Sequence, residues 1–420
     1  MKKLMFVFVM ASLALAACGS KPADKGPVEI TFTMWGAPEE LAVWQAVVDD
    51  FHKASPNITV KVDVSDWDSY WTKLSTLTAG GTPPDVFAMD APLFLDWQSR
   101  GALLNLQPYI DANAGFLDGF YPQTLTAYKT ADGYYGLPRD FQTIVLFYNK
   151  DMFDAAGVDY PTADWTYDDL LAASKKLTVD KDNDGKIDQY GIWTDTWDME
   201  LFWSEAIWAY GGDILSEDHS KTLIGEGGAR DAWAFIDSLY KEGVMPTPTS
   251  SGEFGDDLFQ SKVAAMTTVG HWAVPGYVEA GINFDVAPMP KGPKGQATSV
   301  NSAGFVVSKD SKNADAAFEF IKFALSEAGQ KRLAELGFAI PVLKSVAESD
   351  SYLKQPGDLN QQVFLDSIAF ARTKPVFKGY EEWAGVVGDG LTPVFDGDAE
   401  LDATLDEVIP AADEVLAANK

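Results

Sequence analysis

The segment VEITFTM at residues 28–34 alternates apolar and polar side chains with a period of two, which predicts a β-strand. A helical pattern opens at Pro38, and ITVKV at residues 58–62 predicts a second strand. Residues 67–79 again have helical spacing, and DVFAM at residues 85–89 predicts a third strand. Because strand and helix alternate, this part of the chain predicts an α/β fold with a largely parallel sheet.

The rest of the chain continues this mixture. An extended run at residues 143–148 is followed by mainly helical patterns as far as Tyr240, and strand patterns return at residues 263–266 and 284–287. With 420 residues, the chain exceeds what a single hydrophobic core usually serves. We therefore expect two lobes.

The N-terminus has the pattern of a bacterial export signal. Lys2 and Lys3 precede an apolar stretch at residues 4–17, which is shorter than the ~20 residues that a spanning helix needs. The stretch ends in LAAC at Cys18, which resembles the lipoprotein signal. In that signal the cysteine is lipidated and becomes the new N-terminus, so we expect a lipid anchor on Cys18.

Composition excludes several kinds of site. Cys18 is the single cysteine, so the chain has no internal disulfide, cysteine-based zinc site or catalytic thiol. Three histidines in all argue against a multi-histidine metal centre. A net charge of −30 argues against nucleic acid and anionic lipid surfaces as partners. The 13 tryptophans are more informative, because tryptophan covers the flat apolar faces of sugars well.

A set of short motifs occurs in order along the chain. They are TMWG (residues 33–36), GGTPPDV (80–86), GLPRDFQT with YNKD (136–151), GHW (270–272), the helix 315–330 and the C-terminal segment 383–416. Each motif is weak alone. In this order, behind a lipoprotein signal, they identify a resemblance to the extracellular solute-binding proteins of sugar ATP-binding-cassette importers.

The resemblance implies an α/β, two-lobed periplasmic-binding-protein-like II fold, with hinge crossings near residues 138–141, 300–302 and 341–344. The implied division is a signal peptide (1–17), a tether (18–27), a first lobe (28–139 plus 302–341) and a second lobe (140–301 plus 342–420).

The resemblance also implies a function. The chain would be a binding subunit, not an enzyme, that captures a carbohydrate between its lobes by hinge closure. It would then deliver that sugar to the permease subunits of the importer. We expect a lipid-anchored monomer at the outer face of the cytoplasmic membrane or in the periplasm, with no cofactor required. Several tryptophans outside helical patterns favour an oligosaccharide, because several stacking rings imply several sugar units.

A sugar site needs aromatic rings for the C–H faces and fixed polar groups for the hydroxyls. Carboxylates and arginine suit the hydroxyls, because charge-assisted hydrogen bonds are roughly twice as strong as neutral ones. Candidates therefore lie at strand ends and loops. Trp35 and Asp90 each follow a predicted strand, and Asp66 and Trp67 open a predicted helix, where Asp66 could alternatively be the N-cap.

Further candidates lie in the middle of the chain. Arg139, Asp140 and Gln142 lie at a presumed crossing, where Arg139 could instead pair with Asp140. Trp193 and Trp197 fall in a polar turn, and one of them is expected to stack on sugar. By resemblance, the GHW motif supplies a stacking Trp272, with His271 beside it. Resemblance more than chemistry adds Asn301, Arg372, Tyr380 and Trp383.

An acidic loop could hold calcium. In DKDNDGKID, residues 180–188, oxygen-bearing side chains occupy positions 1, 3, 5 and 9 and glycine occupies position 6, as in a calcium-binding loop. The predicted ligands are Asp180, Asp182, Asp184, Lys186 through its carbonyl, and Asp188. Position 12 is Gly191 in place of the usual glutamate. We expect at most a weak structural site, and an Asx-rich surface turn is the alternative.

Two other functions stay open at this point. A secreted glycoside hydrolase would also be rich in tryptophan and aspartate. Such an enzyme needs two carboxylates flanking the scissile bond, and no local motif indicates such a pair. A binding protein for another solute, such as a polyamine, iron or phosphorylated glycerol, is the second alternative. The acidic composition would suit a polyamine.

Overall fold

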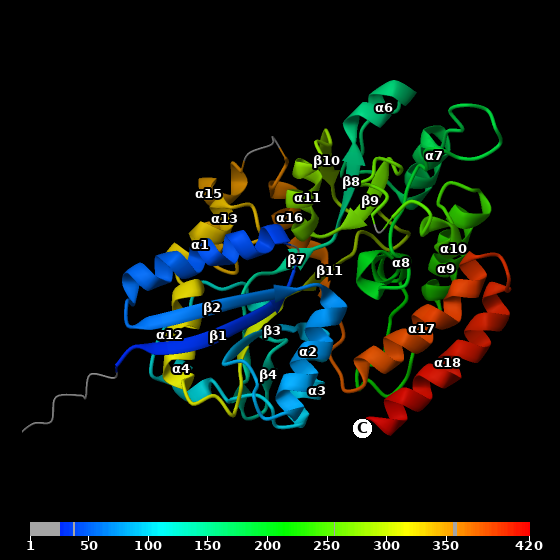
Figure 1. The fold of residues 1–420 in the computed structure, drawn as a ribbon. Helices are drawn as coiled ribbons and strands as arrows, with labels where there is room; N and C mark the ends of the chain where they lie inside the picture. The colour runs from blue at the N-terminus through cyan, green and yellow to red at the C-terminus, as the bar shows by residue number, and fades with distance from the viewer. Residues whose placement is uncertain (1–25, 37, 256, 356–358) are drawn as a thin grey trace, which may run out of the picture.

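The computed structural model describes residues 26–36, 38–255, 257–355 and 359–420. The predicted signal peptide and the predicted lipidation at Cys18 lie outside these residues. Figure 1 shows an α/β molecule of two lobes, with the N-terminal half of the first lobe in blue and the C-terminal helices on the opposite lobe in red. The expected fold class is therefore confirmed.

The first lobe is built on a five-stranded sheet in the order β2-β1-β3-β12-β6. These strands are β1 (Val28–Trp35), β2 (Ile58–Ser65), β3 (Val86–Asp90), β6 (Gly136–Pro138) and β12 (Ala303–Val307). The strands β2 and β3 run parallel to β1, whereas β12 is antiparallel to both β3 and β6. The three sequence-predicted strands are thus the parallel part of a mixed sheet.

Helices cover both faces of this sheet (Figure 1). The helices α1 (Pro38–Ala54), α12 (Ala314–Ala324) and α13 (Glu327–Glu335) contact one another, and α2 (Trp67–Ala79) contacts β1 and β2. The core below α1 is aromatic. The ring of Phe32 lies 5.3 Å from Trp44, 5.4 Å from Phe305 and 5.5 Å from Phe320. Burial of these apolar rings holds the helices on the sheet.

The second lobe has a smaller antiparallel sheet in the order β10-β8-β9 and many more helices. The strands are β8 (Val145–Asn149), β9 (Met266–Val269) and β10 (Phe284–Ala287). The larger helices are α6 (Lys150–Ala156), α7 (Tyr167–Leu177), α8 (Trp203–Tyr210), α9 (Gly228–Lys241), α17 (Tyr380–Phe395) and α18 (Leu401–Ala418). The helical character expected for the middle of the chain is therefore found.

A third sheet of short strands lies between the two lobes. It contains β7 (Gln142–Thr143), β11 (Thr298–Asn301) and β13 (Ala371–Thr373) in the order β13-β11-β7. Along the chain, β7 comes after β6 of the first sheet and before β8 of the second, and β11 leads directly into β12 of the first sheet. The chain therefore passes from sheet to sheet at two of the places where crossings were expected.

The segment after Pro341 differs from the expected boundary at residue 342. The amide of Tyr121 donates to the carbonyl of Val342 (3.1 Å), and the amide of Lys344 donates to the carbonyl of Gly119 (2.9 Å). Helices α14 (Lys344–Ala347) and α15 (Asp350–Leu353) then contact α13. These residues therefore lie with the first lobe, because their backbone pairs with it and α13 offers them a packing surface.

The remaining elements are short. They are η1 (Ala91–Leu93), α3 (Phe94–Ser99), α4 (Gln107–Asp111), α5 (Pro122–Leu125), β4 (Lys129–Thr130), β5 (Gly133–Tyr134), η2 (Met199–Leu201), α10 (Pro248–Ser251), η3 (His271–Ala273), α11 (Val274–Glu279), α16 (Gln362–Asp366) and η4 (Ser367–Phe370). Within the described ranges, no helix combines the length and the apolar character that crossing a membrane requires.

Close packing beside the interlobe strands makes one stability prediction. A Cβ added at Gly304 in β12 would lie 2.6 Å from the Tyr128 ring, whose hydroxyl lies 2.9 Å from the carbonyl of Met89. We expect Gly304→Ala to lower the free energy of unfolding by about 1–3 kcal/mol, measured by urea denaturation.

The matched control for this substitution is Gly385→Ala in α17. A Cβ at Gly385 meets no atom within 4 Å, and alanine favours a helix over glycine. This variant should therefore keep or raise the stability, by up to about 1 kcal/mol. Equal stability of the two variants would contradict the packing argument.

Candidate functional site

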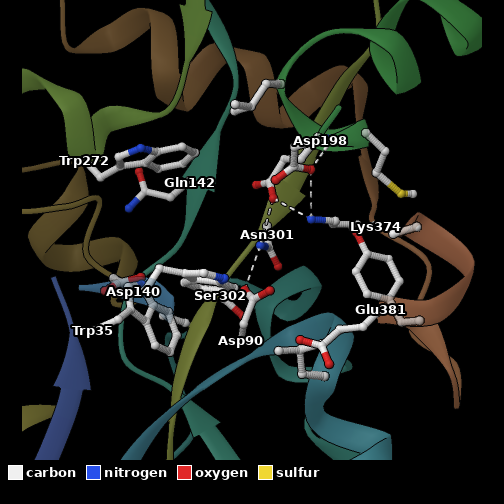
Figure 2. Close-up of a pocket in the computed structure, with 18 of the residues that line it drawn as sticks. Trp35, Asp90, Asp140, Gln142, Asp198, Trp272, Asn301, Ser302, Lys374 and Glu381 are labelled. Atoms are coloured by element: carbon white, nitrogen blue, oxygen red, sulfur yellow. Dashed lines mark hydrogen bonds and ion pairs between the residues drawn. The ribbon is translucent and has the colours of Figure 1, made fainter. Parts of the chain in front are cut away.

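A cavity of about 610 Å³ opens between the lobes at the ends of the crossing strands. Figure 2 shows side chains from both lobes converging on it. Its wall is formed by Trp35, Glu40, Trp67, Asp68, Asp90, Leu93, Arg139, Asp140, Gln142, Trp197, Asp198, Met199, Glu200, Leu201, Trp272, Asn301, Ser302, Ala303, Phe338, Lys374, Tyr380, Glu381 and Ala384. This volume is in the range of small-molecule sites.

Three tryptophans in the wall keep a large part of their surface open. Trp67, at the start of α2, is 43% exposed, Trp197, before η2, is 46% exposed, and Trp272, in η3, is 38% exposed. The first comes from the first lobe and the other two from the second. Trp35 supports Trp67 edge-on, with ring centroids 5.0 Å apart. The cavity is therefore bordered by apolar rings on both sides.

Glycines and one carboxylate hold two of these rings in place. A Cβ at Gly270 would lie 1.9 Å from the ring of Trp272, so the ring lies directly on the backbone there. Gly388 in α17 likewise leaves room for Trp197, since a Cβ there would lie 2.6 Å from its ring. The indole N–H of Trp197 donates to Asp389 at 2.8 Å. Both rings are thus fixed although they are exposed.

The floor of the cavity is polar and connects the lobes. The side-chain amide of Asn301, at the end of β11, donates to Asp90 and to Glu200, both at 3.1 Å. Asp90 ends β3 of the first lobe, whereas Glu200 lies in η2 of the second. Burial raises the pKa of Asp90, although Lys374 opposes this effect. The side-chain oxygen of Asn301 (Oδ1) is buried and accepts no hydrogen bond from the described residues.

Lys374, just after β13, is the cation at the centre of this floor (Figure 2). Its ammonium lies 2.9 Å from Glu200, 3.5 Å from Asp198 and 5.3 Å from the ring centre of Tyr380. Burial raises the pKa of Glu200 to about 7, although Lys374 favours the carboxylate. Burial would lower the pKa of Lys374, but Asp198 and Glu200 outweigh it and raise this pKa well above its usual value.

Arg139 and Asp140 form the alternative pair that the sequence allowed. The guanidinium Nε donates to Asp140 at 2.9 Å, and both side chains are buried. The guanidinium carbon also lies 5.3 Å, 5.4 Å and 5.6 Å from the ring centres of Trp35, Trp44 and Phe338. Burial raises the pKa of Asp140, which Arg139 opposes. This pair therefore fixes the crossing between β6 and β7.

The structure brings most of the sequence-predicted site residues together. Those in the cavity wall are Trp35, Trp67, Asp90, Arg139, Asp140, Gln142, Trp197, Trp272, Asn301 and Tyr380. Five other predicted residues lie elsewhere, and each has a local structural explanation.

Asp66 and His271 do not line the cavity. Asp66 caps α2 by accepting the amide of Ser69 at 3.0 Å, and this bond lowers its pKa. His271 is fully buried, with a ring nitrogen 2.8 Å from Gln361, and burial lowers its pKa to about 4. The amide of His271 donates to Gln142 at 3.0 Å, so this residue orients a wall residue without lining the wall.

Trp193, Arg372 and Trp383 also lie outside the wall. Trp383, predicted by resemblance to contact the ligand, is instead buried in α17, and its indole N–H donates to Thr222 at 2.9 Å. Arg372 pairs with Asp213 at 2.8 Å and does not line the cavity. Trp193 is half-buried, so only Trp197 of the two turn tryptophans reaches the cavity.

Several wall residues escaped the sequence reasoning. The most important are Asp198, Glu200, Lys374 and Glu381. Asp198 and Glu200 lie one and three residues after Trp197, so the polar turn that drew attention to the tryptophan is a signal that could have found them. Lys374 lies after a strand of three residues, which is too short to be recognised from its pattern.

The acidic loop at residues 180–188 is closed by its own backbone. Asp180, Asp182 and Asp188 each place a carboxylate oxygen within 4.8 Å of the others. Asp180 accepts the amides of Asn183 (2.8 Å) and Gly185 (2.9 Å). This cluster has the oxygen chemistry that calcium prefers, and an Asx turn explains it equally well.

An α/β protein with two lobes and a ligand-sized cavity at their crossing strands has the architecture of a solute-binding protein. Residues 36–331 match the family of bacterial extracellular solute-binding proteins. The chain therefore belongs to this family. It is a binding protein of the importer type, not an enzyme, and the resemblance inferred from the motifs is confirmed.

Individual relatives match over nearly their whole length. A putative binding protein of Brucella abortus is 28% identical over 415 residues, 97% of each chain. The galactooligosaccharide-binding protein of Bacillus subtilis is 26% identical, covering 98% of this chain and 97% of its own. The ABC substrate-binding protein Lmo0181 of Listeria monocytogenes, solved with cycloalternan, has a TM-score of 0.84 and 28% identity, covering 93% and 99%.

The acidic loop makes a metal prediction. If calcium binds at residues 180–188, adding Ca²⁺ to metal-free protein should raise the unfolding temperature, and Asp180→Asn/Asp182→Asn should abolish the rise. Mg²⁺ at the same concentration is the control, because it demands a stricter octahedral geometry. An unfolding temperature that calcium leaves unchanged would identify the loop as an Asx turn.

A buried carboxylate behind β11 makes a pH prediction. Glu205 accepts the amide of Ser299 at 2.9 Å and the hydroxyl of Ser204 at 3.0 Å, and burial raises its pKa to about 8. An acid with a raised folded pKa binds more protons in the folded state, so its contribution to stability falls as the pH rises from its ordinary pKa to about 8.

Glu205→Gln should remove that dependence. Between pH 5 and pH 8, we expect the wild type to lose on the order of a few kcal/mol more unfolding free energy than the variant, in urea denaturation at both pH values. Parallel losses in the two proteins would contradict the assignment.

Proposed function

We propose that this protein captures an oligosaccharide in the interlobe cavity and delivers it to the permease of an ABC importer. The single observation that carries the proposal is the set of three exposed rings, Trp67, Trp197 and Trp272, in the wall of one cavity. Rings at 38–46% exposure are suited to stack on the apolar faces of sugar units. The relatives that bind galactooligosaccharide and cycloalternan support this class of ligand.

Polar groups between the rings complete a sugar site. Asp68 and Glu381 offer carboxylate acceptors to hydroxyl groups. Carboxylates form stronger hydrogen bonds than neutral acceptors do, and a sugar hydroxyl has a proton to donate to each. Several rings and several acceptors fit a ligand of more than one sugar unit.

The mechanism that we propose is hinge closure. Trp67 belongs to the first lobe, whereas Trp197 and Trp272 belong to the second, so a bound sugar contacts both lobes at once. A ligand that contacts both lobes binds the closed form more tightly than the open form. It shifts the equilibrium towards the closed form by that difference in binding free energy. The short strands of the third sheet are where the change in backbone angles is concentrated.

The lipid anchor belongs to the same proposal. Cys18 ends a lipoprotein-type signal, and a maltooligosaccharide ABC transporter solute-binding lipoprotein of Streptococcus pneumoniae is 25% identical over 83% of this chain. An acylated Cys18 and the tether to residue 27 would hold a monomer beside its permease at the outer face of the membrane.

The proposal is tested by thermal unfolding of the chain from residue 27 onward, against a panel of mono- and oligosaccharides and spermidine. A ligand at ~100 times its Kd adds about 2.7 kcal/mol to the unfolding free energy and raises the unfolding temperature. Each mixture is then analysed for breakdown of the sugar. A selective shift with intact sugar supports the proposal, whereas a cleaved sugar or a response to spermidine alone contradicts it.

Trp272 makes a specific prediction. Because its ring is exposed in the cavity wall, Trp272→Ala should weaken binding of the sugar identified by the panel about ten-fold or more, or about 1.4 kcal/mol. Isothermal titration calorimetry measures the loss. Tyr160→Ala, another exposed aromatic but outside the cavity, is the control and should bind like the wild type. Undiminished affinity of Trp272→Ala would contradict the stacking role.

A further inference from the structure

The charges in the cavity wall are strongly unbalanced. Within the described residues, seven wall side chains are carboxylates and two are cations. The carboxylates belong to Glu40, Asp68, Asp90, Asp140, Asp198, Glu200 and Glu381, and the cations to Arg139 and Lys374. What a ligand meets depends on whether these two cations are available to it.

Arg139 is not available. Its Nε donates to Asp140 at 2.9 Å and its guanidinium lies among the rings of Trp35, Trp44 and Phe338. The backbone carbonyl of Arg139 is also fixed, because it accepts the side-chain amide of Gln330 at 2.9 Å. Turning the guanidinium towards a ligand would leave Asp140 buried without its partner, which is costly.

Lys374 is held in the same manner. Its side chain is 5% exposed, and its ammonium is 2.9 Å from Glu200 and 3.5 Å from Asp198. An anion that recruited Lys374 would have to compete with two carboxylates already in contact with it. Both cations are therefore neutralised within the protein.

Glu381 and Asp68 also line the cavity, and neither forms an ion pair within the described residues. Glu381, the second residue of α17, points into the cavity (Figure 2), and the described structure gives it no ion pair. Burial and the nearby Asp96 raise the pKa of Glu381, whereas Arg100, which does not line the cavity, opposes them. Asp68, in the first turn of α2 beside Trp67, is exposed and also has no ion pair there. The field across the cavity is consequently negative.

Resting on the proposed function, we propose that the cavity selects its sugar by charge: it accepts oligosaccharides without acidic groups and rejects uronic, sulfated and phosphorylated sugars. A sugar hydroxyl donates to the carboxylates of the wall and gains from their charge. An acidic group would instead lie among like charges, with both cations occupied, and like-charge contacts are strongly unfavourable. The rings fix the sugar faces, and the carboxylates decide which substituents are tolerated.

The test uses two matched derivatives of the neutral oligosaccharide that the panel identifies. In one, each primary hydroxyl that can be oxidised is converted to a carboxylate. In the other, the same positions carry the neutral amide, which has nearly the same shape. Calorimetry should show that the carboxylate form binds at least about ten-fold more weakly than the amide. The difference should shrink when the salt concentration is raised, because salt screens exposed charges.

Two variants locate the selecting groups. Asp68→Asn/Glu381→Gln removes two wall charges without touching either internal ion pair, and should reduce the difference between carboxylate and amide several-fold. Glu407→Gln/Glu414→Gln makes the same change of net charge on the exposed face of α18, outside the cavity wall, and should leave the difference unchanged. A cooperative thermal unfolding transition shows that each variant is folded. The carboxylate and amide forms are compared within each variant, so a loss of affinity common to both ligands does not affect the difference.

Each result decides the question. Equal affinity of carboxylate and amide forms overturns charge selection while oligosaccharide binding stands. An equal effect of both double variants also overturns it, because the selecting field would then belong to the whole molecule. If no sugar of the panel binds, neutral or acidic, the proposed function fails and charge selection fails with it.

Discussion

The buried ion pair between Arg139 and Asp140 is the constraint on which the rest of the structure depends. It lies between β6 of the first sheet and β7 of the interlobe sheet, enclosed by the rings of Trp35, Trp44 and Phe338. Gln330 then ties the same point to α13 and, through the amide of Val342 at 2.8 Å, to the return of the chain. Removing either charge would leave the other buried and unpaired. The pair thus holds together the elements that border the cavity.

Much of the fold follows from local patterns. The parallel strands β1, β2 and β3 are continuous in sequence and alternate with helices, so period and spacing were enough to predict them. That the first lobe continues beyond the expected boundary at residue 342 could not be found in this way. Val342 and Lys344 are held by backbone bonds to Tyr121 and Gly119, and such bonds leave no mark on side-chain pattern.

Site residues could be predicted where residue type and position along the chain are enough to recognise them. Trp67 opens a predicted helix and Trp197 and Trp272 lie in predicted loops, and all three reach the cavity. His271 was not distinguishable from its neighbour by sequence, because adjacent residues point in different directions and the ring of His271 turns towards Gln361. Lys374 and Glu200 are 174 residues apart and become partners only through the fold. A pair of that kind has no local signature.

The exposed rings also bear on how such a protein changes over time. Trp67, Trp197 and Trp272 are not part of the buried hydrophobic core. Trp67 rests on the rings of Trp35 and Trp71, Trp272 on Gly270, and Trp197 on Gly388 and Asp389. Replacing or moving such a ring alters the recognition surface and leaves the packing of both lobes intact. The demands of folding and those of recognition therefore fall on different residues. Proteins that share this fold can therefore acquire a new ligand specificity through a few substitutions in the cavity wall.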